Sequence, residues 1–213
     1  MKTIFLKIAM LAAVAVSTAA QAGPGWEFAQ AGNSYTNGSW NFTNNFRVLS
    51  ALTVTGLGYY ADPTSNMVDN NPVALFSANG TLLASATVTN ANAAVGHFRY
   101  VSISPLTLLA GDYQIAGVSA RDTYTWNDIG FATDSRIQYL GNNWQQDTNG
   151  VADFIAGNGN GNDVADGYWG ANLFIGEPTF AATTGQVPEP GTLALLGLSL
   201  VACVGASRRR AAR

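Results

Sequence analysis

The sequence predicts an all-β fold: an antiparallel β-sandwich, jelly-roll-like or Ig-like, preceded by an N-terminal signal helix and followed by a single C-terminal transmembrane helix. Three observations support this prediction. Apolar and polar residues alternate with a period of two along short segments, Asn and Gly separate these segments, and uncharged apolar runs lie near both ends of the chain. A period of two is typical of strands, and no segment between the two ends repeats with the period of an amphipathic helix.

The clearest strand signal is the alternating segment at residues 81–89. Its apolar residues are expected on one face of the strand and are Leu82, Ala84, Ala86 and Val88. A shorter apolar run at residues 73–76 precedes it, and Asn79-Gly80 lies between the two. Asn-Gly between two strand-like runs is the strongest short-range hairpin signal. The two segments are therefore predicted to form a hairpin.

Further strands are expected at residues 49–60, 97–103, 113–118 and 173–175. Gly56 and Gly58 interrupt the first of these, which indicates a bulge or a close approach of two backbones. Pro105 restricts the link between the second and the third to a loop or an edge strand, because proline cannot donate to a sheet ladder. Residues 121–168 contain several Asn and Gly pairs and are expected to be loop-like. Short strands joined by turn residues predict an antiparallel sandwich.

Residues 1–22 have the pattern of a secretory signal peptide. Two lysines come first, residues 8–16 form an apolar run, and Ala20 and Ala22 stand at the two small positions of a cleavage site. The apolar run is too short to cross a membrane comfortably, which argues against an uncleaved anchor. We therefore predict export and cleavage after Ala22.

The C-terminal segment combines three features in a fixed order. Pro188, Glu189 and Pro190 come first, residues 191–206 carry no charge, and the last residues, 207–213, are basic. As a helix, the uncharged residues would span about 24 Å, slightly less than the hydrocarbon core of a bilayer at about 30 Å. The basic residues predict a cytoplasmic C-terminus and are Arg208, Arg209, Arg210 and Arg213.

This order of features resembles the PEP-CTERM sorting signal of Gram-negative bacteria. The resemblance implies recognition by an exosortase, a membrane-embedded cysteine transpeptidase-like enzyme, with cutting near the Pro-Glu-Pro. It also implies a setting of exopolysaccharide production and of biofilm or floc formation. A plain C-terminal anchor after a proline-rich linker is the alternative. The expected partners are therefore the exosortase, exopolysaccharide, and the inner membrane, through the C-terminal helix, before processing.

These assignments divide the chain into a signal peptide (1–22), a β-sandwich domain (23–176), a linker (177–186) and the sorting signal (187–213), with its span at 191–206 and its basic tail at 207–213. Between residues 23 and 186 the chain has four arginines, no lysine and twelve acidic residues, a net charge of −8. Such a surface repels phosphate backbones and anionic head groups. Binding of nucleic acid or of a membrane surface by this part is therefore disfavoured.

Residues 45–118 carry a second resemblance. The segments Gly-Leu-Gly-Tyr-Tyr at 56–60, Val-Ala-Leu-Phe-Ser-Ala-Asn-Gly-Thr-Leu-Leu-Ala at 73–84, and Phe-Arg-Tyr-Val at 98–101 are similar to an uncharacterised β-sandwich family of secreted bacterial proteins. This resemblance implies a fold and carries no chemistry. Leu-Ala-Gly-Asp-Tyr, which ends at Tyr113, resembles a tyrosine corner, in which the Tyr hydroxyl ties a crossover between strands.

The domain offers few catalytic groups. His97 is its one histidine, and Cys203, the one cysteine, lies in the C-terminal span, so the domain has no thiol nucleophile and no cysteine metal site. A Ser-His-Asp triad would have to use His97, and no Gly-x-Ser-x-Gly elbow accompanies it. We interpret His97 as an ordinary sheet histidine. We therefore predict that the protein is not an enzyme, with a secreted hydrolase as the less favoured alternative.

One stretch has the residue types of a calcium site. Residues 158–167 combine Asn and Asp with Gly, and side-chain oxygens near flexible glycines suit a hard cation. The candidate ligands are Asn160, Asn162, Asp163 and Asp166. The stretch lacks the order of an EF-hand loop and its bidentate Glu, and a loop that uses Asn and Gly for positive φ is the favoured interpretation. We predict no cofactor, with calcium as the alternative.

Five aromatic residues lie among polar neighbours and offer a sugar-stacking surface: Trp40, Trp126, Trp144, Tyr168 and Trp169. For most of them core packing is the favoured interpretation, because large aromatic side chains dominate protein cores. The sequence thus predicts an exported protein of the cell envelope or extracellular matrix, structural or interactive in role and associated with exopolysaccharide. Its single-pass anchoring in the inner membrane would be transient or persistent. The alternative function is a carbohydrate-binding module.

Overall fold

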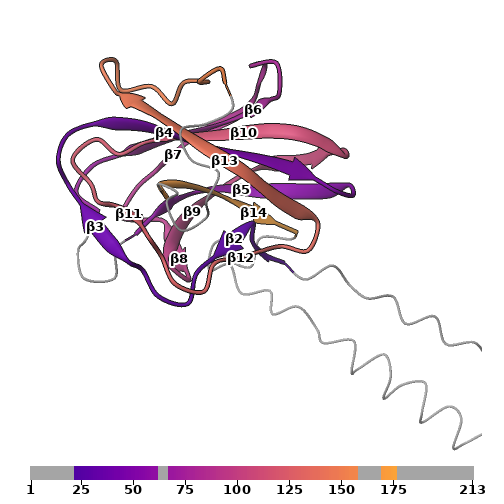
Figure 1. The fold of residues 1–213 in the computed structure, drawn as a ribbon, viewed down its shortest axis with the longest axis horizontal. Coiled ribbons are helices and arrows are strands. Elements are labelled where there is room, and N and C mark those ends of the chain that lie inside the picture. Colours follow the sequence, from indigo (N-terminus) through magenta and orange to yellow (C-terminus); the bar gives the residue numbers. More distant parts are fainter. Residues whose placement is uncertain (1–21, 62–66, 158–168, 177–213) are drawn as a thin grey trace, which may run out of the picture. The chain divides into compact units, whose positions relative to one another are not determined.

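The structure is a computed structural model that describes residues 22–61, 67–157 and 169–176 (Figure 1). One five-stranded sheet has the order β1-β14-β5-β9-β8 and consists of Gly23–Pro24, Ala171–Ile175, Leu52–Tyr60, Phe98–Leu108 and Ala93–Val95. The second has the order β13-β4-β10-β6-β7 and consists of Ile137–Gln146, Trp40–Val48, Gly111–Val118, Asn71–Ser77 and Leu82–Val88. Two small sheets pair β2 (Trp26–Glu27) with β12 (Ala132–Thr133) and β3 (Asn33–Tyr35) with β11 (Tyr124–Trp126).

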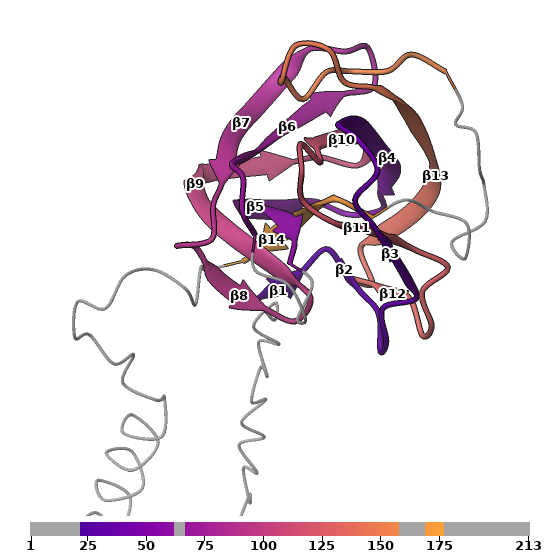
Figure 2. The same cartoon turned by 90° about the vertical axis from the view of Figure 1, so that its left-hand side faces the viewer.

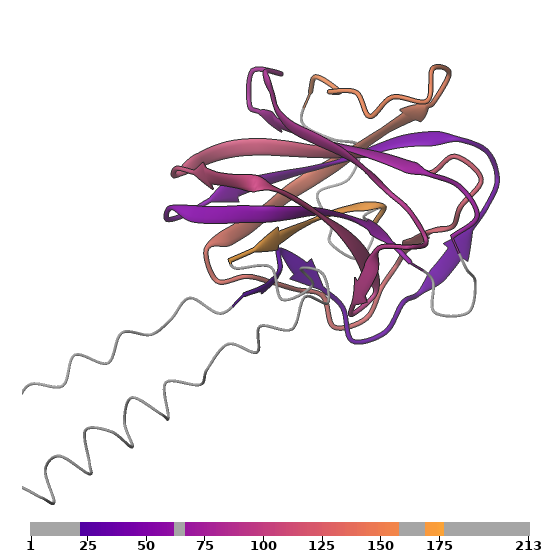
Figure 3. The same ribbon diagram turned by 180° about the vertical axis from the view of Figure 1, so that it is seen from behind.

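The two five-stranded sheets lie face to face, as Figures 2 and 3 show. Their facing side chains form one continuous apolar cluster, in which Leu57 of the first sheet and Phe46 and Leu75 of the second are fully buried. The described residues are therefore all-β with antiparallel sheets, as the sequence predicted, and the arrangement is consistent with a β-sandwich. The predicted signal helix and transmembrane helix lie outside the described residues.

Strands β6 and β7 form the hairpin predicted from Asn79-Gly80. The Ser77 amide donates a hydrogen bond to the Thr81 carbonyl and closes the turn. Gly80 has a φ of +82°, in the left-handed region that glycine adopts without strain. The side-chain oxygen of Asn79 accepts hydrogen bonds from the amide and the hydroxyl of Thr81. This dipeptide therefore shapes the turn as expected.

The face of β7 that points to the core differs from the prediction at one residue. The ladder between β6 and β7 skips Leu83, which is the extra residue of a bulge. After the bulge the predicted inward residues pack against the core or are buried: Ala84, Ala86 and Val88. Leu82, before the bulge, is instead 54% exposed. The prediction is wrong for Leu82 because one inserted residue reverses the alternation of side chains along a strand.

The bulge predicted at the glycines of β5 is present next to Gly56, whereas Gly58 makes room mainly for a side chain. The ladder between β5 and β9 shifts register between Val54 and Gly56, which is a bulge. Gly58 lies against the ring of Tyr100 in the neighbouring strand, where a Cβ atom would overlap the ring. A larger residue at position 58 would therefore displace a fully packed aromatic side chain. Gly56 follows the bulge of β5, and Gly58 leaves room for the Tyr100 ring.

Strand β9 continues through Pro105, at which the sequence predicted a loop or an edge. β9 pairs with β8 only along residues 98–100, and its ladder with β5 skips residues 103–105. Pro105 therefore lies in an irregular stretch where β9 is an edge, a position that proline tolerates. The tyrosine corner predicted just after this strand is present. The Tyr113 hydroxyl donates a hydrogen bond of 3.0 Å to the Leu109 carbonyl.

The prediction that residues 121–168 are loop-like is wrong in part. Three strands lie there, and the longest is β13, which pairs with β4 along its whole length apart from a bulge at Leu140. The sequence analysis did not predict β4 either. Asn, Gln and Gly give β13 a low intrinsic strand propensity, and pairing with a strand far earlier in the chain overrides that propensity. Residues 158–168 lie outside the described residues.

Side-chain amides hold residues 151–157 on the outer face of the second sheet. Gln114 donates a hydrogen bond to the Ile155 carbonyl and accepts one from the Ile155 amide, both at 2.9 Å. Asn41 makes the same paired contact with the backbone of Asp153, at 2.8 and 3.3 Å. A side-chain amide has the donor and the acceptor that a neighbouring strand would offer. These amides therefore take the place of a missing strand.

We expect Gln114→Ala to lower the free energy of unfolding by about 2 kcal/mol, because the Ile155 amide and carbonyl both lose their partner. Gln138→Ala is the matched control, since Gln138 lies in the same sheet with an exposed side chain. Urea unfolding followed by tryptophan fluorescence measures both variants. Equal losses of stability would contradict the role of Gln114.

Candidate functional site

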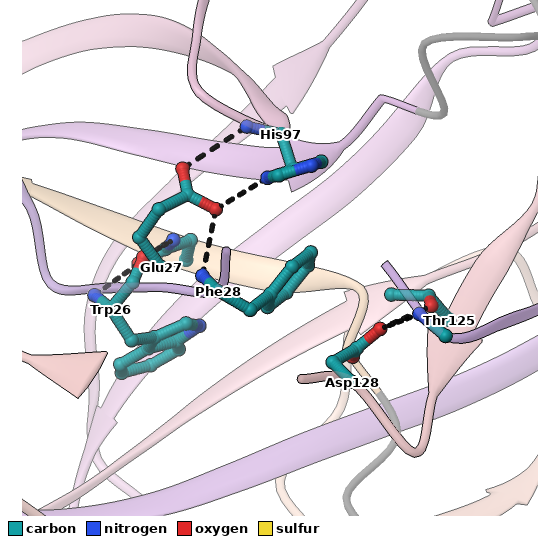
Figure 4. Close-up of polar contacts among 8 residues, drawn as sticks. Trp26, Glu27, Phe28, His97, Thr125 and Asp128 are labelled. Carbon is teal, nitrogen blue, oxygen red and sulfur yellow. Dashed lines mark hydrogen bonds and ion pairs between the residues drawn. The ribbon is translucent and has the colours of Figure 1, made fainter. Parts of the chain in front are cut away.

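The one histidine of the domain contacts a carboxylate (Figure 4). His97 lies in the turn between β8 and β9, and its Nδ1 is 2.8 Å from Oε1 of Glu27 in β2. The His97 amide donates to Oε2 of Glu27 at 3.1 Å, and the Phe28 amide donates to Oε1 at 3.0 Å. The carboxylate therefore receives three contacts and ties β2 to the β8–β9 turn.

Two neighbours hold this pair in place. The Phe28 ring lies 4.7 Å from the His97 imidazole, with the two planes inclined by 35°. Gly96 has a φ of +59°, and a Cβ at this position would overlap the Glu27 carboxylate. Glycine at position 96 therefore serves twice: it adopts the left-handed conformation, and it leaves room for the carboxylate to reach the backbone of His97.

The Glu27–His97 pair has two of the three members of a hydrolytic triad. In a triad the histidine also contacts the hydroxyl or thiol that it activates. No hydroxyl among the described residues is hydrogen-bonded to the His97 imidazole. From the sequence, His97 was expected within a strand. In the structure it lies in a turn, just before β9. Sequence reasoning missed Glu27, although the alternation of Trp26, Glu27 and Phe28 is itself a strand signal.

Asp128 is buried close to this pair, with 8% of its surface exposed. Its Oδ1 accepts hydrogen bonds from the Gly32 amide at 2.6 Å and from the Thr125 hydroxyl at 2.7 Å (Figure 4). Its Oδ2 has no hydrogen-bond partner. Burial raises the pKa of the Asp128 carboxyl, and the hydrogen bonds from Gly32 and Thr125 offset this in part.

The carboxylates and the histidine do not form a metal centre in the part of the chain that the structure describes. Within residues 22–61, 67–157 and 169–176, no group of three His, Cys, Asp or Glu side chains is arranged to hold a metal ion. The predicted calcium ligands Asn160, Asn162, Asp163 and Asp166 lie outside these ranges. The calcium hypothesis therefore stays a prediction.

A row of six aromatic rings connects the small sheet β3–β11 with strands β4 and β13. We call this set the aromatic row; in spatial order it consists of Trp126, Tyr35, Tyr124, Phe42, Trp40 and Trp144. The centroids of consecutive rings are between 4.5 and 6.5 Å apart. Tyr35 is 40% exposed and Trp144 41% exposed, whereas the two central rings are buried. The exposed rings of the aromatic row are therefore held in place by the buried rings at its centre.

One amide orients the middle of the aromatic row. The side-chain oxygen of Asn37 accepts hydrogen bonds from Nε1 of Trp40 at 2.8 Å and from the Tyr124 hydroxyl at 3.0 Å. Trp40 also meets Trp144 edge to face, with the ring planes inclined by 81°. Such contacts restrict the rotamers of exposed rings and lower the entropy that a ligand would have to remove on binding.

The five aromatic residues predicted as a sugar-stacking surface do not all lie together in the structure. Trp40, Trp126 and Trp144 belong to the aromatic row. Trp169 is fully buried, and its ring lies 4.5 Å from that of Phe131, so core packing is the correct interpretation for it. Tyr168 lies outside the described residues. Sequence reasoning missed Tyr35 and Tyr124, although two aromatic residues spaced as Tyr124 and Trp126 point to one face of a strand.

A groove of about 660 Å³ lies on the outer face of the second sheet. Arg47 and Asp112 line it and form a paired ion contact at 2.6 and 2.9 Å. Gln114 donates to Asn45 at 2.8 Å. The hydrogen bond from Arg47 lowers the pKa of the Asp112 carboxyl. Four polar side chains of the groove are thus bonded in two pairs, Arg47 with Asp112 and Gln114 with Asn45, and Phe154 borders it with an aromatic ring.

The predicted sorting residues lie at or beyond the limits of the described chain. Ala22 is described, and the next residue, Gly23, begins β1 and pairs with Ile175 of β14. Cleavage after Ala22 would therefore place the new N-terminus in an edge strand of the first sheet. The other residues lie outside the described ranges and are Ala20, Pro188, Glu189, Pro190, Arg208, Arg209, Arg210 and Arg213. The described residues include no helix with the length and hydrophobicity that a membrane crossing requires.

The C-terminal tail agrees with a known sorting signal. Residues 186–210 match the PEP-CTERM protein-sorting motif. The chain carries a PEP-CTERM signal. This signal supports export, a membrane-anchored precursor and processing by an exosortase. The match covers the tail predicted from the Pro-Glu-Pro, the uncharged run and the arginines, and the β domain lies outside it. A search of curated proteins gave no match to the chain.

The raised pKa of Asp128 predicts a pH dependence of stability. A carboxyl whose pKa is raised by folding favours the folded state while it is protonated, and this contribution is lost as the pH rises through the folded-state pKa. Asp128→Asn cannot ionise and keeps an acceptor for Gly32 and Thr125. The unfolding free energy of the variant minus that of the wild type should therefore increase between about pH 4 and pH 7.

Asp112→Asn is the control of opposite sign, because Arg47 lowers the pKa of the Asp112 carboxyl. Its stability relative to the wild type should decrease as the pH rises to about 4 and then stay nearly constant up to pH 7, since ionised Asp112 stabilises the folded state fully above the unfolded-state pKa and loses this effect as the pH falls through its lowered folded-state pKa. Denaturant unfolding at several pH values measures both variants. A difference between Asp128→Asn and the wild type that does not vary with pH would contradict the assignment.

Proposed function

We propose that this protein is an exosortase-processed component of the cell envelope or extracellular matrix, with a structural or binding role and an association with exopolysaccharide. The observation that carries the proposal is the PEP-CTERM motif at residues 186–210. The signal sequence predicted at residues 1–22 is consistent with it. In this proposal the domain is not an enzyme and needs no cofactor.

A second, more specific function is favoured by the aromatic row: the domain binds polysaccharide directly. The apolar faces of sugar rings pack against flat aromatic side chains, and Trp and Tyr add a polar group for hydrogen bonding. Tyr35 and Trp144 offer exposed rings at two places in the row. Gln146 lies two residues after Trp144, on the same face of β13, and its exposed side chain supplies an amide of the kind that binds hydroxyl groups.

The charge of the domain narrows the class of polysaccharide. Residues 23–186 carry a net charge of −8. An anionic polymer would be repelled at low ionic strength, because the field of the whole domain acts on it. We therefore favour a neutral polysaccharide or one that contains amino sugars.

The Glu27–His97 pair is consistent with a non-enzymatic role. Its carboxylate accepts two backbone hydrogen bonds in addition to the contact with Nδ1 of His97. These contacts join two segments of backbone, the chain at β2 and the β8–β9 turn, and no nucleophile among the described residues is hydrogen-bonded to the imidazole. We therefore assign the pair a structural role.

We expect replacement of Pro188, Glu189 and Pro190 by alanine to abolish processing, because prolines keep the segment extended and accessible for the exosortase. The variant should accumulate as an uncleaved membrane form. Intact mass and cell fractionation in an exosortase-containing host measure this.

Alanine replacement of Thr179, Thr183 and Thr184 in the preceding segment is the control and should leave processing unchanged. Normal cleavage of the Pro-Glu-Pro variant would contradict recognition of the motif.

We expect Trp144→Ala to weaken binding to a neutral or amino-sugar polysaccharide by roughly tenfold, which corresponds to about 1.4 kcal/mol. A glycan array identifies the polymer, and calorimetry on the best one gives the affinity. Phe154→Ala is the control, because Phe154 borders the outer groove and not the aromatic row. Loss of binding in Phe154→Ala alone would move the site to the groove, and absence of saturable binding would exclude direct sugar recognition.

A further inference from the structure

Strand β7 is an unpaired edge of the second sheet. It pairs with β6 on one side, and no strand among the described residues pairs with its other side. Figure 2 shows β7 at the margin of the sandwich. The free edge presents a row of backbone donors and acceptors, which is a template for a further strand.

The other sheet edges carry features that discourage such pairing. β1 has two residues and contains Pro24, and β8 has three residues. The ladder of β13 is interrupted near its middle by a bulge at Leu140. Short strands, prolines and bulges are the usual means by which natural sheets protect their edges. β7 has its bulge at Leu83, near its start, and continues with five regular residues.

These five residues, Ala84 to Val88, contain no charge and read almost the same in both directions. In an antiparallel pair of two copies about Ala86, Ser85 of each copy lies opposite Thr87 of the other. Ala84 then lies opposite Val88, and Ala86 meets its own counterpart. Ser85 and Thr87 are exposed, so their hydroxyls are free to form cross-strand hydrogen bonds of the kind that stabilise sheets.

We propose that the protein forms a dimer through antiparallel pairing of β7 with β7 of a second copy. The near-symmetry of the five residues identifies the second copy as the occupant, because a two-fold contact requires a surface complementary to itself. The absence of charged side chains on β7 is compatible with this choice. Residues 23–186 carry a net charge of −8, so two copies repel one another, and β7 lets them meet along a strand with no charged side chain.

Exposed apolar surface beside β7 also favours contact with a second copy. Leu82 is 54% exposed and Val151 51% exposed, and both line a shallow groove formed by β6, β7 and residues 150–153. A second copy along β7 would shield part of this surface from water. The contact is isologous and closes on itself, so it produces a dimer with a continuous ten-stranded sheet and not a filament.

The first test changes the charge of the strand. Ser85→Lys/Thr87→Lys places lysine opposite lysine in both outward pairs and should raise the dissociation constant of the dimer at least about tenfold. Gln138→Lys/Gln145→Lys, two exposed positions on the opposite edge strand β13, is the matched control and should remain dimeric. Sedimentation equilibrium of the full chain in detergent, without polysaccharide, measures the mass.

The second test is a covalent one and does not depend on stability. In a Cys203→Ser background, Ser85→Cys/Thr87→Cys should form an intermolecular disulfide under mild oxidation, since opposite residues in a pair have Cβ atoms about 5 Å apart. Gln138→Cys/Gln145→Cys should not. Non-reducing electrophoresis separates the two results.

Three results would overturn the proposal: a monomeric wild type at all concentrations, a dimer that persists in Ser85→Lys/Thr87→Lys as in its control, or cross-linking no greater than in the β13 cysteine variant. Because no sugar is present and the variants share one tail, these results are independent of polysaccharide binding and of sorting.

Discussion

The packing of Trp169 is the interaction on which the rest of the domain depends. This fully buried ring lies 4.5 Å from Phe131, 5.1 Å from Tyr139 and 5.9 Å from Trp26. It thereby joins the chain before β12, strand β13 and strand β2 to the start of β14. The domain has no cysteine, so no disulfide shares this task, and burial of large aromatic side chains holds the two sheets together. Trp26 also places the next residue, Glu27, beside His97.

Side-chain amides of Asn and Gln form hydrogen bonds with backbone groups that no neighbouring strand pairs. Asn172 donates to the Trp26 carbonyl at 2.8 Å and accepts from the Trp26 amide at 3.3 Å, and so attaches β2 to β14. Gln114 and Asn41 hold residues 151–157 in the same way. A buried backbone amide or carbonyl must find a partner, and an amide side chain offers the matching pair. The many Asn and Gln residues therefore serve the fold, and their number is not in itself a sign of a binding site.

The second sheet separates the two surfaces to which we assign roles. β13 and β4, which carry Trp144 and Trp40, lie at one edge of the sheet, and β7 lies at the other. Pairing through β7 would leave the aromatic row free in both copies. A dimer would then bind one polymer at two places, and the second contact gains from effective concentration without any new chemistry. The PEP-CTERM signal supports export and membrane anchoring before processing, which is compatible with both proposed contacts.

Features that depend on neighbours within a few residues could be predicted from the sequence alone. Asn79-Gly80 specifies a turn, Tyr113 reaches a carbonyl four residues away, and the C-terminal tail carries its sorting signal as a short linear pattern. Three features became visible only in the folded chain: the pairing of β13 with β4, the contact of Glu27 with His97 across seventy residues, and the aromatic row. These three features depend on which distant segments become neighbours in the fold, and local propensity does not predict that. The bulge that exposes Leu82 belongs with them, because a single extra residue reverses a strand without leaving a mark in its alternating pattern.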